Sequence, residues 1–156
     1  MPLPTSAAME HQRNSSTAPF AEVILPSDPA EARRFQDEIE QQLLKSSHAS
    51  THEVFSIKLA LEEALINAIK HGNQMDQSKK VHVHYRVSPD RFEVRVSDEG
   101  PGFDPSDVPD PTAVENLERP CGRGLMLMRH YMNDVAYTGR GNCVTMSKLF
   151  GKNGKK

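Results

Sequence analysis

Residues 57–73 read Ile-Lys-Leu-Ala-Leu-Glu-Glu-Ala-Leu-Ile-Asn-Ala-Ile-Lys-His-Gly-Asn, and this stretch decides how the rest of the chain is interpreted. Its apolar residues recur every three or four positions, which predicts an amphipathic helix from about His52 to His71. Gly72 and Asn73 are typical of a helix C-terminus. The apolar stripe expected to face a sheet consists of Val54, Ile57, Leu61, Ala64, Leu65 and Ala68.

A polar stripe runs along the same helix. Glu63, Asn67 and His71 are spaced i, i+4 and i+8, so their side chains are neighbours on the helix surface. A carboxylate beside an amide oxygen suits a hard cation such as Mg²⁺, directly or through water, because such ions prefer oxygen ligands. A solvated helix face would carry the same residues, so this helix alone leaves both interpretations open.

A second motif, Asp98-Glu-Gly100-Pro-Gly102, directly follows a predicted strand. An aspartate at a strand end, with glycines two and four residues later, leaves a carboxylate facing a cleft and lets backbone approach a ligand closely. Such a carboxylate can accept a hydrogen bond from an exocyclic amine, for example that of adenine. A plain turn explains the same residues when the motif is considered in isolation.

A third motif, Gly122-Arg-Gly124-Leu-Met-Leu-Met, opens a short helix predicted over 124–132. Free backbone N–H groups and the positive end of the helix dipole make such a start an anion site, most naturally for phosphate. Arg123 could add a charge-assisted contact, although glycines chosen for packing would look the same. Neither GxxxxGK[ST] nor GxGxxG occurs, so a phosphate site here belongs to another fold.

The remaining elements surround these motifs. Alternating apolar residues and turn residues predict strands over 20–25, 81–87, 92–96, 135–137 and 143–150. Pro89-Asp90 indicates a hairpin between the second and third of these strands, with one face buried and one wet. The order of strands and helices predicts an α+β fold, a two-layer α/β sandwich in which helices cover one face of a mixed sheet.

An earlier helix is expected to follow the first strand. Ser27 or Asp28 can cap it, and Pro29 is tolerated in its first turn because its missing N–H would be unpaired there. The apolar positions that keep helical spacing along it are Ala32, Phe35, Ile39, Leu43 and Leu44.

Composition sets broad limits. Residues 1–18 are expected to be a disordered tail, 19–150 one domain and 151–156 a frayed C-terminus. A net charge of -2 gives no indication of nucleic acid or an anionic membrane as the main partner. No stretch approaches the roughly 20 apolar residues of a membrane span, so a cytoplasmic location is expected.

Taken together, the three motifs resemble those of the GHKL ATPase superfamily with its Bergerat nucleotide-binding fold. The segment Glu63–Asn73 is similar to the N box, Asp98–Gly102 to the G1 box and Gly122–Met128 to the G2 box. The order and separation also fit, over roughly residues 20–150. The motif Glu-Ala-Leu-x-Asn-Ala-x-x-His-Gly-Asn and the small size of the chain resemble the anti-sigma factor serine/threonine kinases. The catalytic domains of histidine kinases are the nearest alternative family.

The resemblance implies a role for each motif. Asn67 would coordinate Mg²⁺ bound to ATP, and Glu63 would act as general base toward a protein hydroxyl. Asp98 would bind the adenine amino group, and residues 103–121 would form an ATP lid. The other implied nucleotide-binding residues are His71, Gly100, Gly102, Gly122, Arg123, Gly124 and Leu125. The family often has Gly-Thr before its last strand, whereas Asn142 follows Gly141 here, so either Asn142 or a water would have to replace the usual threonine contact to adenine.

The function that the resemblance implies is an ATP-dependent serine/threonine protein kinase in a partner-switching circuit. It would sequester a sigma factor and phosphorylate a STAS-type anti-anti-sigma protein, and it would be a possible homodimer. The alternatives are a nucleotide-binding regulatory module without kinase activity and an ATPase of another GHKL branch. The presence of Glu63 favours catalysis, because a module without activity would be free to lose that base.

Overall fold

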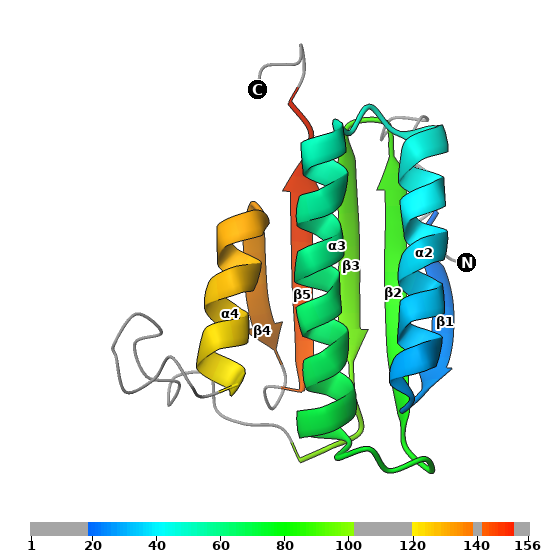
Figure 1. Cartoon of the computed structure of the whole chain (residues 1–156), viewed down its shortest axis with the longest axis vertical. Coiled ribbons are helices and arrows are strands. Elements are labelled where there is room, and N and C mark those ends of the chain that lie inside the picture. The colour runs from blue at the N-terminus through cyan, green and yellow to red at the C-terminus, as the bar shows by residue number, and fades with distance from the viewer. Residues whose placement is uncertain (1–18, 102–119, 139–141, 152–156) are drawn as a thin grey trace, which may run out of the picture.

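The computed structural model describes residues 19–101, 120–138 and 142–151. Their elements follow the predicted order of strand, two helices, hairpin, helix and hairpin (Figure 1). The bounds are β1 Ala21–Pro26, α2 Pro29–Ser46, α3 Thr51–Ile66, the π-helix η1 Asn67–Gly72, β2 Lys80–Ser88, β3 Arg91–Ser97, α4 Pro120–Tyr131, β4 Asp134–Thr138 and β5 Cys143–Leu149. The predicted tail 1–18 and residues 152–156 lie outside the described part.

The five strands form one sheet in the order β1-β2-β3-β5-β4. All four pairings between these strands are antiparallel, so the expected mixed sheet is wrong. A crossover through α4 makes β4 run in the same direction as β3, which would give a parallel pair if the two strands were neighbours. The final hairpin instead places β5 between them, with Ser97 opposite Cys143.

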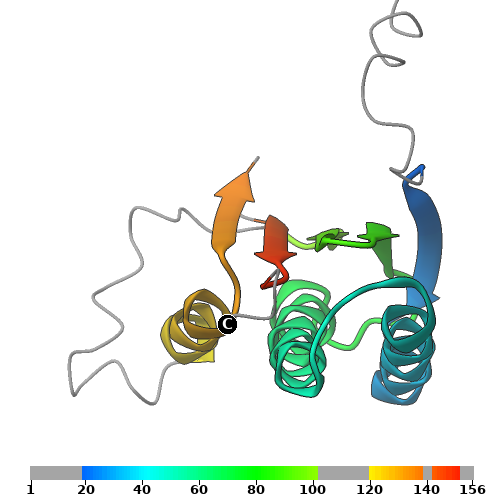
Figure 2. The ribbon, with the colours of Figure 1, turned by 90° about the horizontal axis from the view of Figure 1, so that it is seen from above.

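All three α-helices cover the same face of the sheet, as Figure 2 shows from above. Alternate residues of the central strands point into this helix–sheet layer and are buried, among them Val83, Val96 and Val144, which lie side by side in the register. The opposite face carries partly or fully exposed polar residues such as His84 and Arg95. The predicted two-layer arrangement, with one buried and one wet face, is therefore confirmed.

Helix α2 begins as its sequence predicts. Asp28 is the N-cap, its carboxylate accepting a hydrogen bond from the Ala30 N–H at 3.0 Å, and Pro29 is the first helical residue. Four of the five predicted apolar positions are buried, but Leu44 is 57% exposed. Adjacent helical residues point about 100° apart. Leu43 takes the core position, and Leu44 therefore turns toward solvent.

Helix α3 crosses the middle of the sheet. A capping box starts it: the Ser50 hydroxyl accepts from the Glu53 N–H at 3.1 Å, and the Glu53 carboxylate accepts from the Ser50 N–H at 2.8 Å. All six residues of the predicted apolar stripe are buried. The helix continues to Gly72 as expected, but its last six residues, Asn67–Gly72, are π-helical rather than α-helical.

Helix α4 begins at Pro120, four residues before the predicted start at Gly124. Proline is favoured at the first position of a helix, where its fixed φ is compatible and no N–H is needed. Lys148 on β5 donates a hydrogen bond to the Tyr131 carbonyl at 2.8 Å and so holds the last residue of the helix to the sheet. The predicted ATP lid therefore loses its last two residues to α4, and its segment 103–119 lies outside the described residues.

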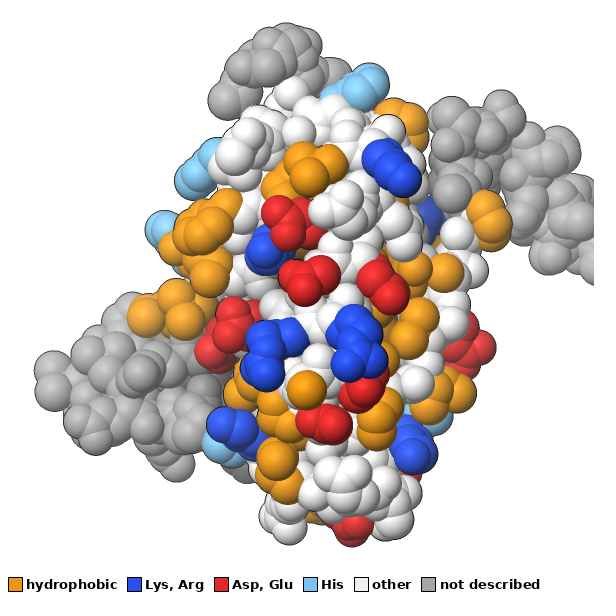
Figure 3. All heavy atoms as spheres, turned by 45° about the vertical axis from the view of Figure 1, so that its right-hand side comes forward, with side chains coloured by type: hydrophobic (Ala, Val, Ile, Leu, Met, Phe, Trp, Pro, Cys, Tyr) orange, Lys and Arg blue, Asp and Glu red, His pale blue; other side chains and the backbone are white. Residues whose placement is uncertain are grey.

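Acidic and basic side chains are interleaved on the face of the molecule in Figure 3. Lys58 on α3 pairs with Glu40 on α2 at 2.8 Å, and Arg34 pairs with Glu31 within α2 at 3.2 Å. Each partly exposed pair of this kind contributes about 0–1 kcal/mol, so packing rather than these charges joins the helices. Among the described residues, no helix combines the length and apolar character that a membrane span requires.

Candidate functional site

The three sequence motifs meet at one end of the molecule. The π-helix η1, the residues that follow β3 and the start of α4 all lie at the lower end of the view in Figure 1. Helix α4 also contacts both α3 and η1. The fold therefore assembles at one place residues that are widely separated in the sequence.

The first motif places an unpartnered amide at this end. Asn67 is the first residue of η1, and its Nδ2 atom is buried without a hydrogen-bond partner. A buried amide group that makes no hydrogen bond costs about 1–3 kcal/mol, so native structures rarely keep one without a reason. Because the two ends of an asparagine amide are assigned from their partners, either atom of Asn67 can face a ligand.

The other two polar residues of the motif differ in exposure. Glu63 is partly exposed on α3, one helical turn before Asn67, whereas His71 is exposed near the end of η1. The π-helix closes with a hydrogen bond from the Asn73 N–H to the Ala68 carbonyl at 2.8 Å. Insertions of this type inside α-helices are frequent at functional sites, because the extra residue redirects the side chains that follow.

The second motif holds a half-buried carboxylate. Asp98 directly follows β3, and its Oδ1 atom accepts a hydrogen bond from the Gly100 N–H at 2.8 Å. Burial raises the pKa of the Asp98 carboxyl above its ordinary value, against the opposing effects of the Gly100 hydrogen bond and the Lys79 charge. The ionised carboxylate is thus kept in a place that stabilises it less than water does.

Two glycines allow the motifs to touch. A Cβ atom on Gly72 would overlap the carboxyl group of Asp98, and a Cβ atom on Gly100 would overlap the Gly72 carbonyl. Real Cβ atoms do not approach other heavy atoms this closely, so a side chain at Gly100 would have to move backbone, and a side chain at Gly72 would displace the Asp98 carboxylate. The end of η1 therefore packs directly against the Asp98 carboxylate.

Asn142, the residue before β5, contacts the backbone of Asp98. Its side-chain Nδ2 atom donates to the Asp98 carbonyl at 3.0 Å, and its backbone carbonyl accepts from the Asp98 N–H at 2.9 Å. Asn142 thus holds the backbone of Asp98 and leaves the carboxylate to other partners.

Three residues of this end were not predicted to take part in a site. Gly72 and Asn73 were expected to end a helix inside the segment that resembles the N box, with no contact of their own assigned, and His82 was expected only to lie on a strand. His82 Nε2 lies 2.8 Å from the Glu99 carboxylate, and this pair lowers the pKa of Glu99. The adjacent Gly72-Asn73 was a signal for a helix end, but nothing local indicated that it would face Asp98 across 26 residues of chain.

The third motif is described in its backbone only. Gly122 lies in the first turn of α4, where N–H groups lack intrahelical partners, whereas Gly124 lies in the second turn. The side chains of Arg123 and Leu125 are not among those described, and Gly102 lies outside the described residues.

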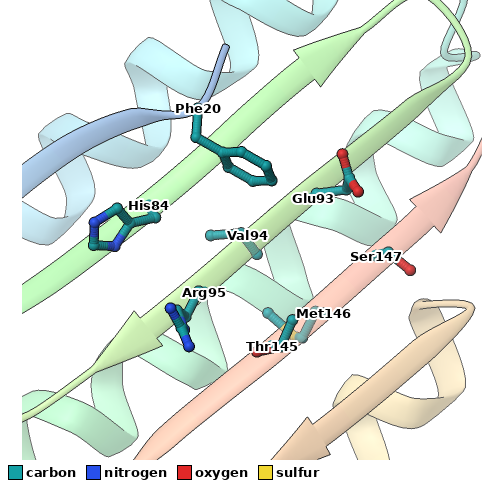
Figure 4. A pocket seen from close by; sticks show the side chains of 8 residues that line it. All are labelled: Phe20, His84, Glu93, Val94, Arg95, Thr145, Met146 and Ser147. Atoms are coloured by element: carbon teal, nitrogen blue, oxygen red, sulfur yellow. The ribbon is translucent and has the colours of Figure 1, made fainter. Parts of the chain in front are cut away.

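A different part of the molecule contains a hollow of about 560 Å³ on the helix-free face of the sheet (Figure 4). Phe20 and His84 lie on one side of it, and Thr145 and Ser147 of β5 lie on the other. None of the residues from the three motifs lines this hollow. The hollow and the three motifs therefore lie in different parts of the molecule. The end with the motifs is the better candidate for a ligand site, because it has a half-buried carboxylate and an unpartnered amide nitrogen.

The groups at the motif end suit a purine nucleotide with a cation. The Asp98 carboxylate can accept from an exocyclic amine, and Asn67 provides an amide that has no partner inside the protein. The backbone contact of Gly72 with Gly100 leaves no side chain between them. Among the described residues, no group of three or more His, Cys, Asp or Glu side chains could hold a metal ion.

Comparison with known proteins identifies what this chain is similar to. A family model described as a histidine kinase-like ATPase domain matches residues 25–148. The serine/threonine-protein kinase BtrW of Bordetella bronchiseptica is 30% identical over 88 residues, which are 55% of this chain and 62% of the relative. The serine-protein kinase RsbW of Listeria monocytogenes is 33% identical over 102 residues, 59% of this chain and 63% of the relative.

Two further proteins extend the comparison. The serine-protein kinase RsbW of Bacillus licheniformis is 32% identical over 112 residues, 66% of this chain and 69% of the relative. The chain thus spans a little under two thirds of the first two relatives. A solved structure of the RsbU and RsbW domains of Rv1364c from Mycobacterium tuberculosis matches 85% of this chain and 32% of that chain, with a TM-score of 0.57 and 16% identity, which supports the fold alone.

Proposed function

Because the chain belongs to the histidine kinase-like ATPase domain family, we propose that it is a serine/threonine protein kinase that binds Mg·ATP at the end of the molecule where η1 meets Asp98. Membership of an ATPase family implies ATP as the nucleotide, and the magnesium ion is part of the proposal. The observation that carries it is the direct packing of η1 against a half-buried carboxylate, beside an amide without a protein partner.

Each proposed ligand contact follows from the chemistry of one side chain. Asp98 accepts a hydrogen bond from the amino group of adenine, and Gly100 and Gly102 keep space beside it. Asn67 would contribute its amide oxygen to magnesium, because such a cation prefers oxygen ligands. Gly122, Arg123, Gly124 and Leu125 at the start of α4 face the phosphates, and His71 lies at the rim.

Glu63 is the proposed general base. It accepts the proton of a serine or threonine hydroxyl on the substrate protein as that oxygen attacks phosphorus. Mg·ATP supplies the transferable phosphoryl group and the positive charge that stabilises its transfer. Since Glu63 lies one helical turn from Asn67, a base and a cation ligand share one helix surface without competing for one position.

The partners of this reaction follow from the resemblance of the three motifs to the anti-sigma factor serine/threonine kinases, and two relatives carry the name serine-protein kinase. We propose that the substrate is a STAS-type anti-anti-sigma protein and that the second partner is a sigma factor, held alternately in a partner-switching circuit. A cytoplasmic location follows from such partners. The proposal includes a homodimer, without assigning the surface through which two copies would associate.

The first experiment measures Mg·ATP binding by calorimetry and phosphoryl transfer from labelled ATP to STAS-domain proteins of the same genome. Wild-type protein is expected to bind ATP and label one of these substrates. Asn67→Ala is expected to weaken binding only when magnesium is present. Glu63→Ala is expected to bind ATP normally and to lose transfer by about 100-fold or more, the usual effect of losing a general base.

Glu62→Ala is the matched control, since Glu62 is the exposed neighbour of Glu63 and points to another side of α3. It should bind and transfer as the wild type does. A wild-type protein that binds no ATP would end the proposal altogether. Binding by the wild type without transfer to any substrate would favour the nucleotide-binding module, and unchanged transfer by Glu63→Ala would remove Glu63 as the base.

A further inference from the structure

Asn73, the residue after η1, is fully buried, and both the nitrogen and the oxygen of its side-chain amide make hydrogen bonds. Its Nδ2 atom donates to the Ser27 hydroxyl at 3.1 Å and to the Lys80 carbonyl at 3.0 Å. Its Oδ1 atom accepts from the Glu99 N–H at 2.8 Å. A carbonyl can only accept and an N–H can only donate, so these partners define the orientation of the amide.

The three partners belong to different parts of the fold. Ser27 follows β1, Lys80 begins β2, and Glu99 follows Asp98. The Ser27 hydroxyl in turn donates to the Lys79 carbonyl at 2.6 Å, so this buried network is satisfied at each of these atoms. Such a network is rigid, because moving any member leaves a buried polar group without a partner. Asn73 therefore ties the peptide after Asp98 to the ends of two strands.

Asn142 holds the same aspartate from the other side. Its backbone carbonyl accepts from the Asp98 N–H at 2.9 Å, and its side-chain Nδ2 atom donates to the Asp98 carbonyl at 3.0 Å, so only the second bond depends on the asparagine side chain. Together the two asparagine side chains secure two successive backbone groups, the Asp98 carbonyl and the Glu99 N–H, and the Asn142 backbone carbonyl secures the Asp98 N–H. The side chain that this secured stretch of backbone carries is the Asp98 carboxylate.

There is little free space around the Asp98 carboxylate. The backbone of Gly72 lies so close that even a methyl group there would overlap Asp98. A hydrogen bond to a ligand is equally sensitive, since displacement by about 1 Å can cost 100-fold in a site. Groups that touch a ligand are held to such limits by the second layer of residues behind them.

We propose that Asn73 and Asn142 are positioning residues that set the nucleobase preference of this protein. By holding Asp98 against Gly72, they place its carboxylate to accept a hydrogen bond from a purine amino group and to repel a carbonyl oxygen at the same position. This inference rests on the proposed binding of ATP, and adds the residues that make the aspartate selective.

The test compares ATP with purine riboside triphosphate, which has hydrogen in place of the amino group. Dissociation constants for both are measured for wild type, Asn73→Ala, Asn142→Ala and Ser27→Ala, together with melting temperatures. Wild type is expected to prefer ATP by about tenfold or more, the value of a hydrogen bond to a charged acceptor. In Asn73→Ala the preference should fall below about threefold, and in Asn142→Ala it should fall by a smaller factor.

Ser27→Ala separates positioning from stability. Ser27 is as buried as Asn73 and is bonded to it, but its other hydrogen bonds join it to Lys79 and Gln77 rather than to the peptide around Asp98. Its variant should melt at a lower temperature and keep the wild-type preference for ATP. A purely structural role for Asn73 would instead lower the melting temperatures of both variants and change the preference of neither, and that result would overturn the proposal.

The remaining outcomes are also decisive. If Asn73→Ala does not fold, Asn142→Ala carries the test, because Asn142 is partly exposed and its loss leaves no fully buried gap. An unchanged preference in Asn142→Ala would then count against positioning. A wild type that binds neither triphosphate refutes the proposed function, whereas a wild type that binds both equally refutes only the role of Asp98 and its supports.

Discussion

The two ends of the continuous helix α3–η1 are built on opposite principles. At the N-terminal end, Ser50 and Glu53 satisfy each other, and the second oxygen of Glu53 accepts from the Gly151 N–H at 2.8 Å. At the C-terminal end, the Asn67 amide has an unpartnered nitrogen, and Gln74 and Met75 have positive φ angles of 53° and 61°. A residue other than glycine in that region costs about 1–2 kcal/mol.

The carboxylates near the two ends shift in opposite directions. Burial alone would raise the pKa of Glu53, but hydrogen bonds from Ser50 and Gly151 outweigh it and lower the pKa below the ordinary value. Burial raises the pKa of Asp98 despite its hydrogen bond from Gly100. The N-terminal end of the helix therefore stabilises the fold. The C-terminal end lowers the stability of the fold, because it keeps a half-buried carboxylate and an unpartnered amide nitrogen that a ligand could satisfy.

The largest expected effect comes from Gly100→Ala, which closes the contact between the two motifs. The added methyl group would overlap the Gly72 backbone, which cannot move aside as a flexible side chain would. We expect a loss of about 3 kcal/mol in the free energy of unfolding, measured in urea. Pro101→Ala, at an exposed position in the same loop, is the control and should cost less than about 1 kcal/mol.

Asp98→Asn should change stability and ligand binding in opposite directions. The raised pKa of Asp98 means that the folded state holds its proton more tightly than the unfolded state, so wild-type stability falls as the pH rises from the ordinary value of 3.8 through the higher folded value. A neutral amide at this position does not titrate and lacks this penalty. The variant should therefore melt at a higher temperature than wild type at pH 7 and bind ATP about tenfold more weakly.

The measurement is a series of melting temperatures from pH 3 to 7 for both proteins, with ATP titrations at pH 7. The difference between the two melting curves isolates Asp98 from the other carboxylates. A difference that favours wild type as the pH rises would contradict the inferred direction of the pKa shift.

Ser50→Ala removes the capping box and should have a moderate effect confined to stability. Loss of an N-cap hydroxyl costs about 1 kcal/mol, which thermal unfolding can resolve. The ATP dissociation constant should stay within about twofold of wild type, because this end of the helix lies far along α3 from η1 (Figure 1). A marked change in affinity would show that the two ends are coupled.

Asn67→Ala should have the smallest effect on stability of this series. Its amide nitrogen makes no hydrogen bond, so the substitution breaks none at that atom and should lower the free energy of unfolding by no more than about 0.5 kcal/mol. The matched variant is Asn73→Ala, in which a fully bonded buried amide is lost, at an expected cost of about 2 kcal/mol. Equal losses in the two variants would mean that Asn67 has a structural partner after all.

Much of the fold was predictable because its elements are encoded locally. The alternation of Val81 and Val83, the cap at Asp28 and the six-residue apolar stripe of α3 each produced the element that the pattern predicted. The errors concern choices that depend on neighbours. Leu44 is exposed because the adjacent Leu43 occupies the core position. The sheet is wholly antiparallel because the last hairpin packs with β5 next to β3.

For the candidate site, the sequence by itself determined the chemical groups: a glutamate and an asparagine one turn apart, an aspartate after a strand, and glycines in both loops. Only the tertiary structure decided that Gly72 faces Asp98 and that Asn73 and Asn142 hold it. The physical reason is range. Helix periodicity and capping act over a few residues, whereas these contacts join segments 26 and 44 residues apart, and only the assembled sheet brings them within hydrogen-bond distance.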